Sequence, residues 1–492
     1  MSFLSLEFAA LALGCIGGYY ALPKRYKNAA ILAASVLFYY LTAGRYVTWL
    51  AAATVITYFA ALACDGAKNE RAKKTVSAVG VALLLGSLVF FKGLLPALTE
   101  AGISLGSISA PLGISFFTFQ SVGYIVDVRR GSVRAERDFV AAAAYLTFFV
   151  HISSGPIEST QRMLPQFCEE HKLGSARLCE AGRRFLLGAF KKAFIADNIG
   201  QFVDAFYYMW QRENGASLAL ACVLYALQLY FDFSGYVDMM AGVAGAMGFE
   251  IAENFCAPYF ACSITDIWNR WHISLTSWFR EYLYIPLGGS RRGFARKLLN
   301  ICIVFLLSGI WHGADLSFLI WGAIFAALRA AEELARRYLP PISPKTGAGR
   351  AALAALGRVY TLIAWCLAYI FFRLDTASDA AAVIVKIFDF SGWSLSAARE
   401  RVYLIALSLT DETALYARAM VAAIALAVAA LLAAEYFTVY RPARDKHRLD
   451  TTSNDLLGAL GEWPRFAAEL VMLALLLAFG SFGSSSFLYY KF

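Results

Sequence analysis

Long apolar blocks recur along this chain of 492 residues, and short charged or turn-forming segments separate them. A helix that crosses a lipid bilayer needs about 20 mostly apolar residues. The first four blocks approach this length and occupy residues 6–22, 29–43, 47–64 and 76–91. Only 16% of the residues are charged, whereas a soluble domain carries about 25%. We therefore predict an all-α polytopic membrane protein, in preference to a large soluble protein with an all-helical core.

The chain divides into regions of different residue composition, although it has no obvious internal repeat and no separate soluble domain. We treat residues 1–492 as a single membrane domain with N-terminal helices in 1–95, a core rich in aromatic, glycine and polar residues in 96–330, and C-terminal helices in 331–492. Further spans are expected at 357–373, 417–437 and 466–482, loops at 338–350 and 438–465, and a loop or interfacial helix within 374–412. In total we expect 11 to 13 membrane-crossing or re-entrant segments.

The formal net charge of +9 is concentrated in the connections between blocks. Basic residues follow the first, third and fifth blocks, in the segments 24–27, 68–74 and 129–137. Lysine and arginine collect in cytoplasmic loops, so the N-terminus is predicted to lie outside the cytoplasm. The charge is then explained by membrane topology, and no nucleic-acid partner is expected. The first block has no basic residue before it, which favours a retained helix over a cleaved signal peptide.

Cysteine and histidine usage gives no sign of a metal or disulfide framework. The nine cysteines lie mostly inside apolar blocks and form no CxxC pair, so they are interpreted as small buried residues. The five histidines do not have the spacing of zinc ligands. No metal site and no bound cofactor are predicted.

The segment TDIWNRWHISLTSWFREYLYIPLGG (265–289) combines aromatic residues with Asn269, Arg270, His272 and Arg280. If it is one helix, Trp268 and His272 share a face, because residues four apart are neighbours on a helix. One interpretation is an interfacial helix with its tryptophans among lipid headgroups and its charges in water. The other is a functional segment that faces the protein interior.

A second segment, LLNICIVFLLSGIWHGADLSFLIWGAIFAAL (298–328), places His312 within a long apolar run. Gly309 and Gly313 allow a helix break or a close backbone approach around the imidazole, which indicates a cavity. A neutral imidazole can take a proton from a hydroxyl and return it to a leaving group. This suits acyl transfer from a thioester to an alcohol, with transport of a polar solute as the competing function. The chain has no GxSxG elbow, Walker loop or dinucleotide-binding motif.

Five motifs together resemble the membrane-bound O-acyltransferase (MBOAT) family, in its bacterial branch that O-acetylates alginate or D-alanylates teichoic acid. They are PLGISFFTFQSVGYIVDVRRG (111–131), FFVHISSGPIEST (148–160), LQLYFDFSGYVDMMAGVAGAMGFEIAENFCAPYF (227–260), WNRWHISLTSWFREYLYIPLGGSRRG (268–293) and FLLSGIWHGA (305–314). The resemblance is strong over residues 110–330. It implies a ring of helices around a central funnel, with the acyl donor entering from the cytoplasm and the acceptor hydroxyl from outside.

The resemblance also implies roles for individual residues. His312 matches the catalytic histidine and is expected to be the general base, with His272 and Asn269 orienting or polarising the donor carbonyl. Arg270 and Arg280 are expected either to bind donor phosphates or to pair with Asp232 and Asp238. The remaining cavity candidates are Trp271, His151, Glu158 and Asp232, and a structural role is an equal alternative for His151 and Glu158.

The C-terminal tail SSSFLYYKF (484–492) contains an aromatic FxYxxF-like pattern. It is either an interfacial anchor or, by resemblance to an acceptor motif proposed for such bacterial systems, a site where Tyr489 carries the acyl group transiently.

The function expected from these observations is transfer of an acetyl group from acetyl-CoA across the bacterial inner membrane for O-acetylation of an extracytoplasmic polysaccharide. The family further implies a periplasmic esterase-like (SGNH) acetyltransferase partner. The alternatives are D-alanyl transfer from a carrier protein to teichoic acid, a transporter of an envelope precursor, and a non-catalytic scaffold subunit.

Overall fold

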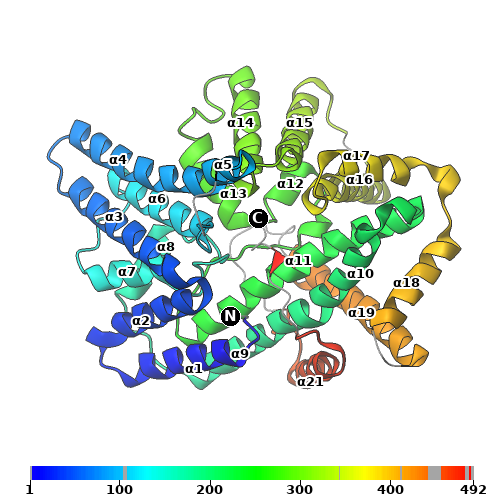
Figure 1. The fold of residues 1–492 in the computed structure, drawn as a ribbon, viewed down its shortest axis with the longest axis horizontal. Coiled ribbons are helices and arrows are strands. Elements are labelled where there is room, and N and C mark those ends of the chain that lie inside the picture. The colour runs from blue at the N-terminus through cyan, green and yellow to red at the C-terminus, as the bar shows by residue number, and fades with distance from the viewer. Residues whose placement is uncertain are drawn as a thin grey trace.

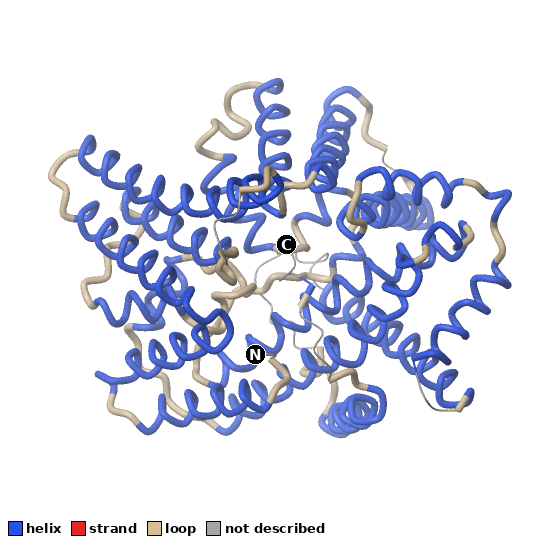
Figure 2. Tube along the Cα trace, in the orientation of Figure 1, coloured by secondary structure: helices blue, strands red, loops and turns tan. Residues whose placement is uncertain are grey.

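The computed structural model describes residues 3–103, 108–342, 344–409, 413–441, 456–482 and 487–488. Helices and their connections make up this part of the chain, and it contains no β-strand beyond one isolated bridge between Phe255 and Trp271 (Figure 2). The helices are arranged around the middle of the molecule (Figure 1). The predicted all-helical class is confirmed.

The first four apolar blocks form the first four helices. These are α1 (Leu6–Ala21), α2 (Lys24–Ala43), α3 (Val47–Asp65) and α4 (Glu70–Val89). The side chain of Ser5 accepts a hydrogen bond from the first turn of α1, and that of Asn69 does the same for α4. These caps satisfy amide groups that have no partner within the helix. The turn-forming residues between the apolar blocks therefore mark the helix boundaries.

The middle of the chain supplies the core. Its principal helices are α6 (Ile114–Arg130), α7 (Phe139–Thr147), α9 (Ser175–Ala189), α10 (Asp197–Tyr208), α11 (Gly215–Ala246), α12 (Ile264–Trp268), α13 (Ile273–Phe279), α14 (Phe294–His312) and α15 (Leu316–Tyr338). A π-helical segment, η4 (Phe190–Ala196), joins α9 to α10. Helix α11 is buried along most of its length and packs against α9, α10 and η4, so it forms the centre of the fold.

The C-terminal region returns to α11 from the other flank. It consists of α16 (Gly347–Arg373), α17 (Ala377–Phe388), α18 (Leu395–Leu409), α19 (Ala414–Glu435) and α21 (Glu462–Phe479). Helices α16, α17 and α18 all contact α11. In Figure 1 they lie opposite α3, α4 and α6, with α14 and α15 side by side between the two flanks. Residues 374–412, predicted as a loop or an interfacial helix, contain the helices α17 and α18.

Six helical runs in the described part of the chain are long and apolar enough to cross a membrane. They are Lys24–Asp65, Glu70–Glu100, Gly215–Ala246, Phe294–His312, Gly347–Arg373 and Ala414–Tyr440. The first of these runs contains both α2 and α3, which a short 3₁₀ turn joins. The protein is a multi-pass membrane protein.

The basic connections after the first and fifth apolar blocks lie on one side of the molecule. Lys27, after α1, is 3.7 Å from Glu170. Cys168 lies two residues before Glu170 in the chain. Its thiol is 3.4 Å from the carboxylate of Glu136, which belongs to the connection after α6. Tyr58 of α3 donates a hydrogen bond of 2.6 Å to the carbonyl of Arg137 in that same connection. We call this side the basic face. The other side, where the hydroxyl of Tyr46 is 3.0 Å from that of Ser109, is the opposite face.

Candidate active site

His312 is the last residue of α14 and is 5% exposed. The helix ends there because Gly313 adopts an extended conformation. Aromatic rings surround the imidazole, with centroid distances of 4.5 Å to Trp311, 5.2 Å to Trp321 and 4.8 Å to Phe372. The prediction of a helix break beside a buried imidazole is confirmed.

Glycines bring α14 and α15 into close contact just before His312. A Cβ atom on Gly309 would lie 2.4 Å from the carbonyl oxygen of Phe318. On the facing helix, a Cβ atom on Gly322 would lie 2.6 Å from the carbonyl oxygen of Phe305. Both distances are too short for any side chain. Small residues at such crossings allow close backbone packing in membrane proteins, and here they fix the end of the helix that carries His312.

His272 does not lie within a helix, so the expected shared face with Trp268 is wrong. Helix α12 ends at Trp268 and α13 begins at Ile273. Between them His272 has a φ of 45°, in the left-handed region. This conformation is uncommon for residues other than glycine and is found where surrounding structure enforces it, often at functional sites. Helical periodicity cannot anticipate such a break.

Asn254 holds the chain in this unusual conformation. Its backbone carbonyl accepts a hydrogen bond from the amide of Ile273, and its side-chain oxygen accepts one from the amide of Ser274, both at 3.0 Å. The antiparallel bridge between Phe255 and Trp271 fixes the residue on the other side of His272. The imidazole is 1% exposed. His272 is thus clamped by its neighbours on both sides.

The two imidazoles are brought together, although 40 residues separate them in the sequence. The ring of Phe116 on α6 stacks with His272 at 6.5 Å and meets Trp311, the neighbour of His312, at 6.2 Å. The ring of Trp311 in turn lies 4.5 Å from that of His312, so Phe116 and Trp311 connect the two imidazoles. Both candidates for proton transfer therefore belong to one buried centre.

Two cavities approach this centre from opposite faces. On the opposite face a cavity of about 340 Å³ is lined by Thr42, Tyr46, Lys92, Ser109, the segment 110–116 and Ser153. On the basic face a cavity of about 430 Å³ is lined by residues that include Phe119, Asp127, Arg130, Glu158, Arg162, Ser274, Trp278 and Tyr282.

A wall of three aromatic residues separates the two cavities. Phe116 lines the cavity of the opposite face and Phe119, one helical turn later on α6, lines that of the basic face. Both rings contact Trp311, with centroid distances of 6.2 Å and 5.5 Å respectively. The residue next to Trp311 is His312. The candidate general base thus lies beside the partition between the two cavities.

Lys92 is part of this centre, and sequence reasoning missed it. Its ammonium donates a hydrogen bond of 2.9 Å to the carbonyl of Trp311 and lies 5.5 Å from the centre of the Trp311 ring. It also lines the cavity of the opposite face. A lone lysine in the apolar sequence VFFKGLL (89–95) was a usable signal, because charges inside membrane segments are costly and are candidates for function.

Three other candidates of the 265–289 segment, Trp271, Asn269 and Arg280, do not line either of these two cavities. Trp271 packs in a buried aromatic cluster, 5.0 Å from both Phe255 and Trp365. Asn269 and Arg280 are exposed and line a third cavity of about 310 Å³, which Ser308 of α14 also lines. The tryptophans 268 and 271 contact protein rings and do not form the exposed interfacial face that was one of the two interpretations.

Of the two roles expected for Arg270, pairing with the acidic residues of α11 is wrong. Arg270 bonds to Asp266 at 2.7 Å, one helical turn away. Asp232 instead pairs with Lys192 at 2.6 Å. Asp238 pairs with Lys191 at 2.8 Å and with Arg184 at 3.3 Å. The partners come from α9 and η4, which pack along α11, and a sequence does not show which helices will be neighbours.

His151 and Glu158 have different surroundings. The Nε2 of His151 donates to the carbonyl of Tyr145 at 3.1 Å, and its ring packs 5.7 Å from Phe148, which favours the structural role. Glu158 lines the cavity of the basic face. Its carboxylate accepts hydrogen bonds from Arg162 at 2.9 Å and from the amide of Ala252 at 2.5 Å. Tyr489, the candidate acyl carrier, lies outside the described residues.

Two cavities that approach one buried pair of imidazoles from opposite faces suit an enzyme whose two substrates lie on opposite sides of a bilayer. The sequence model of the membrane-bound O-acyltransferase family matches residues 102–374. The chain belongs to this family, and it is an O-acyltransferase.

Two relatives are similar to this chain over most of its length, and a third over less than half of it. A probable alginate O-acetylase AlgI of Pseudomonas putida is 32% identical over 500 residues, which cover 97% of each chain. A peptidoglycan O-acetyltransferase of Helicobacter pylori is 31% identical over 428 residues, or 79% of each chain. A teichoic acid D-alanyltransferase of Bacillus subtilis is 31% identical over 232 residues, which cover 44% of this chain and 57% of the relative.

Proposed function

We propose that this enzyme takes an acetyl group from acetyl-CoA on the cytoplasmic side and delivers it outward for O-acetylation of a cell-envelope or secreted polysaccharide. The observation that supports this most directly is that two cavities on opposite faces end at Phe116 and Phe119, whose rings both contact Trp311, the residue before His312. The similarity to an alginate O-acetylase and to a peptidoglycan O-acetyltransferase over most of their lengths supports acetyl as the acyl group and a polysaccharide as the final acceptor.

His312 acts as the general base in this proposal. The imidazole removes the proton of the acceptor hydroxyl as the oxygen attacks the thioester carbonyl. The carbon–sulfur bond then breaks, and the imidazolium returns the proton to the departing thiolate. His272 orients or polarises the carbonyl from the other side of Phe116. The proton that the imidazole takes from the hydroxyl is passed to the thiolate, so the reaction needs no metal and no redox partner.

The charge distribution supports entry of the donor at the basic face. Basic connections favour the cytoplasmic side of a membrane, which also gives an N-terminus outside the cytoplasm, in a bacterial inner membrane. The cavity on this face contains Arg130 and Arg162. Arginine recognises phosphate groups well, and coenzyme A carries several. Asn269 and Arg280, which line the third cavity, are further candidates for contacts with the donor.

Tyr489 is the proposed acceptor at the outer end of the reaction. Its phenol would take the acetyl group at the histidine centre and hold it as an ester. An esterase-like (SGNH) partner in the periplasm would then move the group to the polymer. The competing role for the tail is an interfacial anchor, which needs the aromatic rings and not the hydroxyl.

The direct test is acyl transfer by the purified protein in nanodiscs. We expect label from radioactive acetyl-CoA to appear on the protein and none from a D-alanyl carrier protein. His312→Ala should abolish the labelling, and Tyr489→Phe, which retains the ring, should remove the covalently bound label. Labelling by the D-alanyl carrier alone would assign the other branch of the family, and labelling by neither donor would refute the proposal.

A further inference from the structure

A buried ion cluster lies where η4 and the start of α10 pack on α11. The ammonium of Lys192, in η4, is 2.6 Å from Asp232 and 2.7 Å from Asp197. All three side chains are at most 7% exposed. Burying charges is costly even when they are paired, and π-helical segments such as η4 are frequent at functional sites. The cluster therefore calls for an explanation beyond helix packing.

Residues at the end of α21 and just after it contact this part of the protein. The carbonyl of Phe479, at the end of α21, accepts a hydrogen bond of 2.9 Å from the side chain of Asn198. The amide of Ser481 donates to the carbonyl of Ala193 in η4, also at 2.9 Å. Ala193 lies in the same π-helical segment as Lys192, and Asn198 follows it at the start of α10. The chain that leads into the tail is thus attached to η4 and to the start of α10 at Phe479 and Ser481.

The tail contacts the ion cluster itself at residues 487 and 488. The amide of Leu488 donates a hydrogen bond of 3.0 Å to Oδ2 of Asp232, whose Oδ1 binds Lys192. The ammonium of Lys192 lies 4.4 Å from the centre of the Phe487 ring, a cation–π distance. The cluster therefore provides the tail with a hydrogen-bond acceptor, the carboxylate of Asp232, and with a cation, the ammonium of Lys192.

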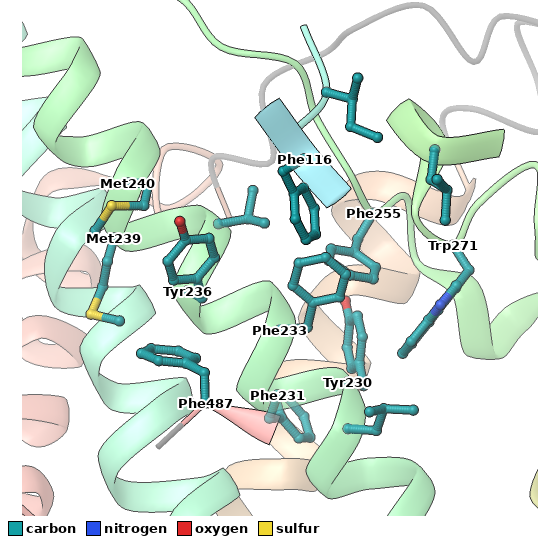
Figure 3. Close-up of a cluster of buried hydrophobic side chains, with 14 of the residues drawn as sticks. Phe116, Tyr230, Phe231, Phe233, Tyr236, Met239, Met240, Phe255, Trp271 and Phe487 are labelled. Carbon is teal, nitrogen blue, oxygen red and sulfur yellow. The ribbon is translucent and has the colours of Figure 1, made fainter. Parts of the chain in front are cut away.

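Phe487 is inserted into the core. Its ring is 5% exposed and meets Tyr236 at 5.0 Å and Phe3 at 5.3 Å, in edge-on contacts. Figure 3 shows Phe487 beside Tyr236, next to the helix that carries Phe231 and Phe233. An interfacial anchor would expose its aromatic rings to lipid headgroups. The burial of Phe487 inside the protein is not what that role requires.

The contact between Asp232 and Leu488 is adjacent to the histidine centre. Asp232, which binds the tail, is followed on α11 by Phe233, and the ring of Phe233 meets that of His272 edge-on at 4.9 Å. Phe233 and Phe116, both in contact with His272, lie close together in Figure 3. The chain is thereby fixed beside the centre at Leu488, the residue that precedes Tyr489.

We propose that Lys192, Asp197 and Asp232 form a binding site for the C-terminal tail of this same chain, and that this site positions the tail for acyl transfer. Asp232 is a positioning residue that acts through the amide of Leu488. The consequence for catalysis depends on the proposed role of Tyr489, but the binding of the tail does not.

Hydrogen–deuterium exchange on the full chain in nanodiscs tests the binding. In Asp232→Asn, which keeps the shape of the side chain and removes its charge, the amide of Leu488 should exchange at least about ten times faster than in the wild type. The matched control is Asp204→Asn, which removes an exposed carboxylate that pairs with Arg373 and should leave the exchange of the tail unchanged. Equal protection of Leu488 in all three proteins would overturn the proposal.

Variants of the tail itself test the positioning without disturbing the helices. Leu488→Pro removes the amide that donates to Asp232, and Leu488→Ala retains it. We expect the proline variant to transfer acetyl at about one tenth of the wild-type rate, with unchanged KM for acetyl-CoA and an unchanged thermal midpoint, while the alanine variant stays close to the wild type. Equal activity of the two variants would refute the positioning role.

The acyl-carrier role of Tyr489 and the binding site for the tail can be refuted separately. Full activity of Tyr489→Phe together with a slow Leu488→Pro would remove the acyl carrier and leave the tail site in place. An inactive Tyr489→Phe together with a fully active Leu488→Pro would do the reverse.

Discussion

Lys92 and Trp311 are 219 positions apart, yet the ammonium of the lysine donates a 2.9 Å hydrogen bond to the backbone carbonyl of the tryptophan. The last carbonyls of a helix have no partner within it, and a cation near them is favourable. The bond therefore joins α4 and its π-helical extension to the end of α14, directly before His312. Lys92, which is remote in the sequence, thereby fixes the position of the His312 imidazole.

We expect Lys92→Met to lower the rate of acetyl transfer about ten-fold. A hydrogen bond to a charged group contributes roughly 1.5–3 kcal/mol, and a ten-fold loss corresponds to about 1.4 kcal/mol of transition-state stabilisation. Steady-state kinetics on the purified protein measure the effect. Lys73→Met, which removes a lysine paired with the exposed Glu70, is the control and should retain full activity. An equally active Lys92→Met would contradict this role.

Gly309→Ala should reduce both stability and activity. The added methyl group would lie 2.4 Å from the carbonyl oxygen of Phe318, so α14 and α15 must separate and His312 must move. Overpacking of this kind costs about 1–3 kcal/mol. Thermal unfolding and acetyl transfer measure the two effects. In the control Gly86→Ala the new methyl group meets nothing within 4 Å, and its stability should equal or exceed that of the wild type.

His272→Gly should separate the conformational role of this position from its chemical role. Glycine adopts a φ of 45° without strain, so the variant should fold with a thermal midpoint near that of the wild type. It lacks the imidazole, and we expect acetyl transfer to fall at least about a hundred-fold, within the range of general acid–base contributions. His272→Val, with a branched side chain that disfavours positive φ, should unfold at a lower temperature. Wild-type activity in the glycine variant would exclude a catalytic role for His272.

Trp311→Ala should join the cavities of the two faces. Water would then reach the thioester, and the ratio of acetyl-CoA hydrolysis to acetyl transfer should rise. Release of free coenzyme A in the absence of acceptor measures this leak. Trp463→Ala, at a site where the side chain is 82% exposed, is the control and should leave the ratio unchanged. A Trp311→Ala variant that loses transfer without gaining hydrolysis would show that the tryptophan does not separate the cavities.

Local patterns predicted the helices well and the contacts between them poorly. The apolar blocks correspond to α1–α4 because a membrane helix satisfies its own backbone hydrogen bonds, so length and hydropathy are enough to locate it. His312 was found for a similar reason, since an imidazole between two glycines inside an apolar run is unusual on its own. Both predictions needed only neighbouring residues.

The errors concern residues whose environment comes from distant parts of the chain. A helical face for Trp268 and His272 was expected, but Asn254 and Phe255 from another segment bend the backbone there. Pairing of Asp232 with an arginine of the 265–289 segment was one of two alternatives, but the packing of η4 on α11 gives Asp232 the partner Lys192. Lys92 was overlooked because its partner, Trp311, is remote in sequence.

The sequence by itself determined that this chain spans the membrane in many helices, which family it belongs to and which imidazole is the candidate base, because hydropathy and short motifs depend on residues close together in the chain. The tertiary structure decided that two cavities approach the aromatic residues beside that imidazole from opposite faces and that Leu488 of the tail contacts a buried ion cluster. Those features depend on which helices pack side by side, and that choice arises from shape and charge matched across hundreds of residues.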